Sequence, residues 1–148
     1  MAEYETKQYL SVYLGTQSFG VPTTTIRDVL RALPVTPVPC APGHIAGISN
    51  LRGRIVTVID LFSRIHEERK QDETPEMQMN VVVESRGELY ALLVDRVGDV
   101  LALDPAEMEP PPLTLREAWR DLCTGVNKRE GELMALLDLQ KVVHPEDQ

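Results

Sequence analysis

The hydrophobic pattern of residues 47–65 (GISNLRGRIVTVIDLFSRI) predicts a β-strand between a tight turn and a short helix. Both alternating sets of positions in residues 55–61 are rich in Val, Ile and Leu, which is typical of a strand covered on both faces. Gly53 permits the turn before this strand, because a residue without Cβ can adopt a positive φ. Asp60 closes the strand, where its carboxylate can cap a helical turn over residues 61–65.

The same pattern recurs in residues 131–143 (GELMALLDLQKVV), where Gly131 matches Gly53 and Asp138 matches Asp60 at one constant offset. A second set of matches lies upstream at a different offset and pairs Phe19 with Tyr90 and Asp28-Val29-Leu30 with Asp99-Val100-Leu101. Chance similarity between two Val/Leu-rich strands is the alternative explanation. The ordered agreement of Gly, Asp and Pro favours two similar β halves packed together, with an insertion between the two sets.

Short strands joined by turns account for most of the remaining chain. They are predicted at residues 8–14, 19–21, 77–84, 88–97, 99–103, 125–128 and 132–137. Helical turns are predicted at residues 23–30, where Ile26 and Val29 share one face, at 44–46, and at 114–121, after a Thr114/Glu117 capping box. The four prolines in residues 33–42 predict an edge strand or an extended connector. The pattern as a whole predicts an all-β barrel or sandwich with short helices.

The division of the chain is predicted from charge. Residues 66–76 are rich in Glu and Lys, which is typical of an exposed loop and of a boundary between halves. One half would then comprise about residues 15–75 with C-terminal elements added, and the other about residues 76–140, within a single domain over residues 1–148. Residues 1–6 are predicted to be a frayed tail.

Composition narrows the function classes. The 148-residue chain has a formal net charge of −8, which argues against nucleic acid or an anionic membrane surface as a partner. It has no apolar run near the roughly 18–20 residues that would insert through a bilayer, and no signal-peptide pattern at its start. Its two cysteines, Cys40 and Cys123, do not form a disulfide framework, so we expect a cytoplasmic protein.

Catalytic chemistry has no support in the sequence. His44, His66 and His144 lack ligand spacing, and the nucleotide and hydrolase motifs are missing, so we predict no metal, no cofactor and no catalytic residue. Asp60 and Asp138 occupy the same place in two similar halves, so capping accounts for both. A binding module is the remaining interpretation, and a small β-barrel enzyme or ligand carrier that uses a cleft between the halves is the competing one.

Arg52 is the strongest candidate for partner binding, because it lies at a tight corner before the central strand and could present its guanidinium to a carbonyl or carboxylate. A solvent-facing arginine, or one that forms a salt bridge within the fold, is an equal alternative. Ile26, Val29, Val82 and Val100 are either ordinary core residues or the lining of a groove where the halves meet.

The motif Asn50-Leu51-Arg52-Gly53, followed by Ile55-Val56-Thr57-Val58-Ile59-Asp60-Leu61, resembles the CheW chemotaxis coupling proteins. Further resemblance extends over nearly the whole chain, at Phe19-Gly20-Val21, Ile26-Arg27-Asp28-Val29, Gly47-Ile48, Val94-Asp95-Arg96-Val97 and Asp99-Val100. Two departures stand out: the family usually has Pro where Thr57 stands and Arg where Phe62 stands.

The resemblance implies two intertwined SH3-like, five-stranded β-barrel subdomains and no catalysis. It implies an adaptor between the regulatory domain of the histidine kinase CheA and the cytoplasmic tip of methyl-accepting chemoreceptors, recruited to membrane-associated arrays. It suggests a receptor-facing groove, and the candidate partner-binding residues are Ile26, Val29, Gly47, Asn50, Arg52, Val82 and Val100. A scaffold in a system with a pilus or other output is the alternative, and a fragment of the kinase itself is disfavoured.

Overall fold

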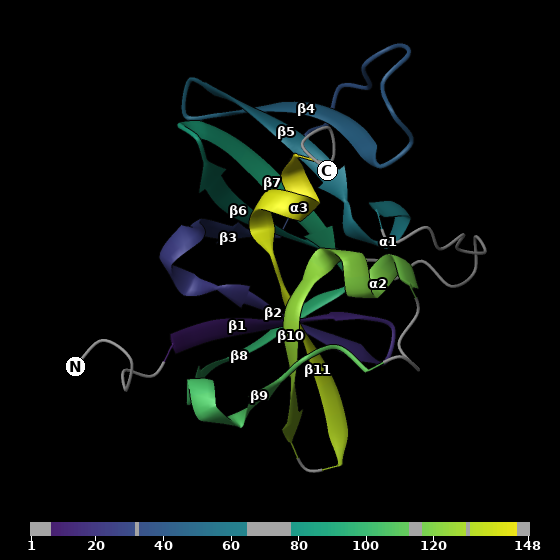
Figure 1. The fold of residues 1–148 in the computed structure, drawn as a ribbon. Helices are drawn as coiled ribbons and strands as arrows, with labels where there is room; N and C mark the ends of the chain where they lie inside the picture. The colour runs from purple at the N-terminus through teal and green to yellow at the C-terminus, as the bar shows by residue number, and fades with distance from the viewer. Residues whose placement is uncertain (1–6, 32, 65–77, 113–116, 130, 145–148) are drawn as a thin grey trace. The chain divides into compact units, whose positions relative to one another are not determined.

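A computed structural model describes residues 7–31, 33–64, 78–112, 117–129 and 131–144. The chain divides into two compact units, which we describe separately (Figure 1). Unit 1 comprises Met1–Thr24 and Val97–Gln148, and unit 2 comprises Thr25–Arg96. Each unit is built on one β-sheet, and the helices are short, which confirms the predicted all-β class. None of the helices in the described ranges is long and apolar enough to cross a membrane.

Unit 2 holds a five-stranded sheet in the order β3-β6-β7-β5-β4. Its strands are β3 (Ile26–Leu30), β4 (Ile45–Leu51), β5 (Arg54–Asp60), β6 (Met79–Ser85) and β7 (Glu88–Val94). Strands β5 and β7 run parallel, and the other neighbours are antiparallel. Helix α1 (Leu61–Arg64) follows β5 directly, and the Asp60 carboxylate accepts a hydrogen bond from the Phe62 N–H at 3.1 Å, as predicted for a cap.

Unit 1 holds a six-stranded sheet in the order β8-β1-β2-β11-β10-β9. Its strands are β1 (Lys7–Leu14), β2 (Gln17–Pro22), β8 (Arg96–Leu103), β9 (Met108–Glu109), β10 (Cys123–Arg129) and β11 (Glu132–Leu137). Its short helices are η2 (Thr23–Thr25), η4 (Pro105–Glu107), α2 (Glu117–Leu122) and α3 (Leu139–Val143). Asp138 caps α3 by accepting a hydrogen bond from the Gln140 N–H at 3.1 Å, as Asp60 caps α1.

The internal repeat is confirmed by strand order and by register. Strands β8, β1, β2, β11 and β10 of unit 1 stand in the same order as β3, β6, β7, β5 and β4 of unit 2. Ser18 is opposite Met134 in the parallel β2–β11 pair, and Leu89 is opposite Val56 in the parallel β7–β5 pair. Matching glycines with positive φ, Gly53 and Gly131, directly precede β5 and β11.

The division into units differs from the predicted halves. The sequence repeat runs from β1 to β5 and again from β6 to β11, yet each unit combines strands of both repeats: unit 2 has three strands of the first and two of the second, and unit 1 has two of the first and four of the second, including the short β9. The cause is the parallel pairing of β5 with β7 and of β11 with β2, which the repeat alone does not specify. The predicted boundary loop 66–76 and the predicted tail 1–6 lie outside the described residues.

Two predicted helices are wrong. Residues 23–30 form the single turn η2 followed by strand β3, and residues 44–46 lead into β4. The residues in and around β3 are largely β-branched, and pairing with β6 gives them a sheet partner, so the extended conformation is favoured over a helix. The helix predicted at 114–121 is observed at Glu117–Leu122, while the capping residue Thr114 lies outside the described ranges.

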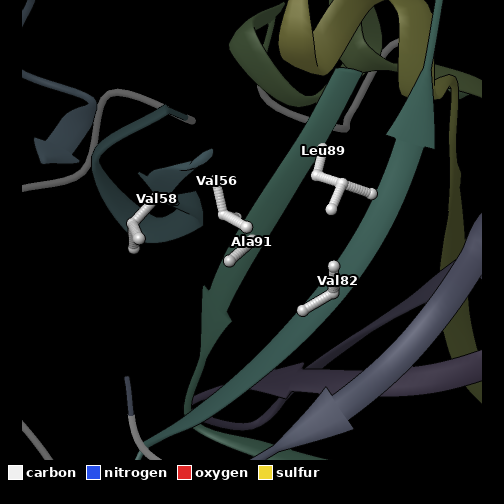
Figure 2. Close-up of a cluster of buried hydrophobic side chains, with 5 residues drawn as sticks. All are labelled: Val56, Val58, Val82, Leu89 and Ala91. Carbon is white, nitrogen blue, oxygen red and sulfur yellow. The ribbon is translucent and has the colours of Figure 1, made fainter. Parts of the chain in front are cut away.

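The core of unit 2 is a cluster of five side chains with no or little exposure, drawn in Figure 2: Val56, Val58, Val82, Leu89 and Ala91. Leu30, Leu33, Ala46, Leu51 and Leu93 pack against this cluster. The prediction that β5 is covered on both faces holds for Ile59, which is 2% exposed, and is wrong for Ile55, which is 61% exposed. In unit 1, Phe19 packs edge-on against Trp119, with ring centroids 5.4 Å apart.

Candidate partner-binding surface

The turn between β4 and β5 carries two of the candidate residues, Asn50 and Arg52. Leu51 is opposite Arg54 in the β4–β5 pair, so Arg52 and Gly53 form a two-residue hairpin turn with φ values of 51° and 85°. Positive φ at both positions defines a type I′ turn, which favours Asn, Asp or Gly. The Asn50 side chain accepts a hydrogen bond from the Gly53 N–H at 2.9 Å, so Asn50 shapes the turn.

Arg52 is both largely exposed to solvent and paired with a carboxylate within the fold. Its side chain is 77% exposed, and its Nη2 atom lies 3.2 Å from Oδ2 of Asp28 in β3. An ion pair this exposed contributes about 0–1 kcal/mol, so it does not by itself explain an arginine at a position that disfavours one. A residue held in a sparsely populated conformation while most of its side chain faces solvent is typical of a binding site.

Close packing of the backbone explains why a glycine occupies position 47. A Cβ atom built on Gly47 would lie 2.3 Å from the backbone oxygen of Thr36, which belongs to the proline-rich connector. Thr36 exchanges two backbone hydrogen bonds with Ile48, at 2.8 and 2.9 Å, so the connector covers the outer edge of β4. The predicted extended connector is therefore present, and Gly47 permits its close approach.

The four apolar candidates have different environments. Ile26 and Val29 lie on the edge strand β3 and are half-buried, so each keeps some exposed surface next to Asp28. Val82 has 0% exposure and belongs to the core cluster, so the structure assigns it to packing and not to a contact surface. Val100 is 52% exposed but lies on β8 in unit 1. Unit 2 thus places Arg52, in the turn that Asn50 shapes, against Asp28, which lies between Ile26 and Val29 along β3.

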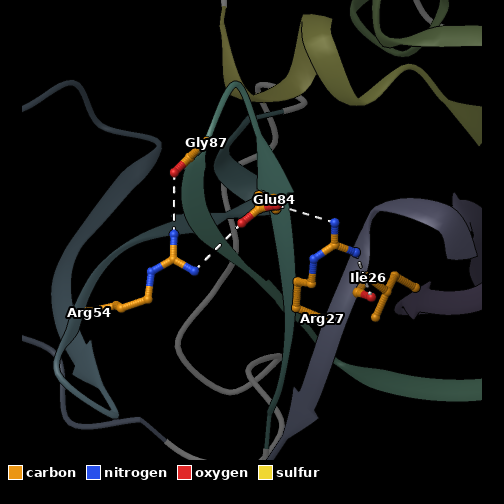
Figure 3. Close-up of polar contacts among 5 residues, drawn as sticks. All are labelled: Ile26, Arg27, Arg54, Glu84 and Gly87. Atoms are coloured by element: carbon orange, nitrogen blue, oxygen red, sulfur yellow. Dashed lines mark hydrogen bonds and ion pairs between the residues drawn. The ribbon is translucent and has the colours of Figure 1, made fainter.

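A polar network on unit 2 was not predicted. In Figure 3, Glu84 on β6 pairs with Arg27 on β3 at 3.2 Å and with Arg54 on β5 at 3.6 Å. Arg54 also donates a hydrogen bond to the backbone oxygen of Gly87 at 3.3 Å. No sequence spacing links these residues, because β-sheet pairing alone brings them together. Beside them, the exposed Ile55 helps to line a pocket of about 310 Å³.

Thr57 and Phe62, the two departures from the family motif, lie in different structural environments. Thr57 lies on the inner strand β5 and is opposite Ile48 on one side and Tyr90 on the other. Its backbone N–H therefore lies within a strand paired on both sides, where proline would remove a donor. Phe62 is half-buried in α1, next to the capping Asp60.

Among the titratable groups in the described ranges, the Cys123 thiol has a large pKa shift. No group of three or more His, Cys, Asp or Glu side chains there could hold a metal ion. Burial raises the pKa of the Cys123 thiol to about 12, and the nearby Lys141 only partly opposes this shift, so the thiol is protonated at neutral pH. Cys40, in contrast, is exposed.

Comparison with known proteins agrees with this architecture. The family model for the CheW-like domain matches residues 8–146. The chain is 28% identical to the chemotaxis protein CheW of Rhizobium meliloti (strain 1021), over 95% of this chain and 90% of that protein. It is 27% identical to protein FrzA of Myxococcus xanthus, over 93% of this chain and 85% of that protein.

A solved structure shares the whole fold. The crystal structure of the scaffolding protein TtCheW from Thermoanaerobacter tengcongensis superposes with a TM-score of 0.80 and 27% sequence identity. The match covers 94% of this chain and 93% of that chain. The family model matches nearly the whole chain, and the solved scaffolding protein has the same fold. This chain therefore belongs to the CheW-like domain family.

Proposed function

We propose that this chain is a non-catalytic adaptor that couples chemoreceptors to the histidine kinase CheA in a bacterial chemosensory array. Its partners are the regulatory domain of CheA and the cytoplasmic tip of a methyl-accepting chemoreceptor. It works in the cytoplasm, recruited to membrane-associated arrays, and needs no cofactor. Membership of the CheW-like family and the relatives named CheW support this proposal.

The observation that carries the proposal is the position of the exposed Arg52 against Asp28 of β3, because Arg86 has a similar backbone conformation in the β6–β7 turn. An arginine with φ of 51° and a side chain 77% exposed occupies a turn position that suits Asn or Gly better. Its guanidinium lies 3.2 Å from Asp28, which stands between the half-buried Ile26 and Val29 along β3. Such a surface offers a partner helix both apolar contact area and a donor for a carbonyl or carboxylate.

The other candidate residues have supporting roles in this proposal. Asn50 fixes the backbone of the Arg52 turn, Gly47 permits the connector to approach β4, and Val82 packs in the core of unit 2. Val100, on unit 1, is proposed as a partner contact by virtue of its exposure alone.

The test is a charge reversal in a reconstituted array of receptor, kinase and this chain. Arg52→Glu is expected to leave the thermal unfolding midpoint within a few degrees and to reduce receptor control of kinase activity severalfold. The matched control is Arg86→Glu, because Arg86 occupies the corresponding position of the β6–β7 turn with φ of 53°. Unchanged kinase control in Arg52→Glu, or an equal loss in both variants, would contradict the proposal.

The alternative is the same scaffold in a system with a pilus or other non-flagellar output. Deletion of the chain in its host distinguishes the two, because a flagellar system would lose directed swimming and a pilus system would lose surface motility. A small-ligand carrier is the weaker reading, and stoichiometric binding in a metabolite screen would support it.

A further inference from the structure

Unit 1 contains a pocket of about 250 Å³ that the proposed adaptor role does not use. It is formed by strands β1, β2, β8 and β11 and is lined by residues that include Ser11, Tyr13, Ser18, Asp99, Glu132 and Met134. Small-molecule sites usually measure about 300–1,000 Å³, so this pocket suits a group the size of one side chain.

The internal repeat explains why the pocket exists. Ser18 in unit 1 is equivalent to Leu89 in unit 2. Ser18 is opposite Met134 on β11, and Leu89 is opposite Val56, the residue of β5 that matches Met134. Ser11 is likewise equivalent to Val82. Ser11 is opposite Gly20 on β2, and Val82 is opposite Ala91, the matching residue of β7. In unit 2 the two apolar side chains fill the core cluster (Figure 2), whereas in unit 1 two serines leave the equivalent space hollow.

Hollow, polar space of this kind weakens a fold. A small side chain where a large one could be buried leaves space without packing contacts, which destabilises a fold. Ser18 is only 8% exposed as a residue, and its hydroxyl oxygen makes no hydrogen bond within the described ranges but is not fully buried. The hollow therefore has on its wall a hydroxyl that no protein group uses, and this hydroxyl is available to a ligand.

The backbone around the pocket is held in place. The Ser11 hydroxyl donates a hydrogen bond to the backbone oxygen of Asp99 at 2.8 Å. Gly98 permits β8 to approach, since a Cβ there would lie 2.6 Å from Ser11 Oγ and 3.0 Å from Tyr13 Cε2. The pocket is therefore a built feature of the β1–β8 contact.

Charge identifies the complementary ligand. Asp99 and Glu132 both line the pocket, together with the Tyr13 ring, and no Lys or Arg is among its lining residues. In unit 2 the place of Glu132 is taken by Arg54, so the two units differ in sign here. Unit 1 carries six Lys and Arg against 13 Asp and Glu, whereas unit 2 carries nine against ten.

We infer that this pocket receives the guanidinium or ammonium group of a single Arg or Lys side chain from a partner protein. The carboxylates supply charge-assisted acceptors, the Tyr13 ring supplies a cation–π surface, and the Ser18 hydroxyl supplies a further acceptor. The site is distinct from the Arg52 surface of unit 2, so it gives the chain a second, acidic contact point.

The test uses the full chain and backbone-amide NMR. The probe is the capped tripeptide acetyl-Gly-Arg-Gly-amide, and its control is the same peptide with citrulline, which has nearly the same shape but no charge. Saturable shifts at Ser18, Asp99 and Glu132, with affinity at least about tenfold higher for the arginine peptide, are expected. Equal binding of both peptides, or shifts scattered over the acidic surface, would overturn the inference. Binding of free agmatine without binding of the tripeptide would overturn the assignment to a protein side chain.

Two variants locate the effect. Ser18→Leu installs the residue of unit 2 and fills the hollow without changing charge, so peptide affinity should fall at least about tenfold. Glu132→Arg should lower it similarly, whereas Glu107→Arg makes the same charge change at an exposed position outside the pocket and should alter affinity less than about twofold. Retained affinity in Ser18→Leu, or equal losses in the two Glu→Arg variants, would contradict the site. Should Ser18→Leu not fold, the two charge variants decide the question.

Discussion

Arg52 and Asp28 connect the two outermost strands of the unit 2 sheet. Asp28 lies on β3 and Arg52 follows β4, which are the first and last strands in the order of pairing, and the two side chains meet at 3.2 Å. The same hairpin turn that exposes the guanidinium therefore also brings it to the opposite edge of the sheet. A partner that engages Arg52 thus contacts a site where both sheet edges converge.

The ion pair itself should add little stability. A double-mutant cycle with Asp28→Ala, Arg52→Ala and both together is expected to give a coupling free energy below about 1 kcal/mol, because the arginine is largely solvated. Urea unfolding monitored by circular dichroism measures it. A coupling above about 2 kcal/mol would mean that closure of the sheet depends on this pair, and the binding argument for Arg52 would weaken.

The turn conformation predicts a gain in stability at the expense of function. Arg52→Asn places the preferred Asn-Gly pair in the type I′ turn and should raise the free energy of unfolding by about 0.5 kcal/mol or more. Receptor control of the kinase should fall at the same time, since the guanidinium is lost. Arg86→Asn, in the equivalent turn before β7, should give the same stability gain with kinase control intact. A destabilised Arg52→Asn would show that the arginine is retained for folding.

Much of the fold could be predicted from the sequence because the repeat involves residues with fixed local roles. Gly53 and Gly131 are needed in their turns, and Asp60 and Asp138 cap the helices that follow, so their matching reflects matching structure. The exchange of strands between the repeats could not be predicted, since local pattern does not state which strand pairs in parallel with β5.

The site could be predicted only in part. The Arg52 turn has a clear signal in its glycine and in the motif around it, whereas β3 was mistaken for a helix because residues 26, 29, 30 and 33 also fit helical spacing. The burial of Val82 and the exposure of Ile55 depend on which sheet face is covered, and near-continuous apolar strands give no alternation to decide it. The Arg27–Glu84–Arg54 network depends on tertiary pairing alone.

Gly47 should tolerate no side chain. Gly47→Ala forces a Cβ atom against the Thr36 backbone oxygen, at 2.3 Å before any adjustment, and should lower the free energy of unfolding by about 2–3 kcal/mol. Gly43→Ala is the control, because a Cβ at Gly43 meets no atom within 4 Å. Thermal unfolding of both variants is sufficient, and equal midpoints would show that the connector does not hold the position described for it.

The two cysteines should differ in reactivity. A thiol reagent at pH 8 is expected to modify the exposed Cys40 quickly, while Cys123 stays unmodified until the chain unfolds, because burial raises its pKa to about 12. Mass spectrometry of the labelled chain identifies the site. Modification of Cys123 at a comparable rate would contradict its burial.

The raised pKa of Cys123 also sets the sign of a pH effect. The unfolded thiol ionises near its ordinary value of 9.0 and the folded thiol only near 12, so the unfolded state is favoured increasingly as pH rises through that interval. The difference in unfolding free energy between pH 8 and pH 10.5 should therefore be larger in the wild type than in Cys123→Val. Identical pH dependence in the two proteins would show that the thiol does not titrate as described.

Val82 and Val100 provide the sharpest separation of packing from contact. Val82→Ala removes a side chain with 0% exposure from the core of unit 2 and should lower the free energy of unfolding by about 1–3 kcal/mol. Val100→Ala, at a position 52% exposed, should change it by less than about 0.5 kcal/mol. If Val100 contacts a partner, Val100→Ala weakens assembly with receptor or kinase without any loss of stability, whereas any loss of assembly in Val82→Ala accompanies its loss of stability. Assembly measured by co-sedimentation with receptor and kinase, at a temperature where both variants are folded, distinguishes these effects. A Val82→Ala variant that is fully stable but defective in assembly would return Val82 to the contact surface.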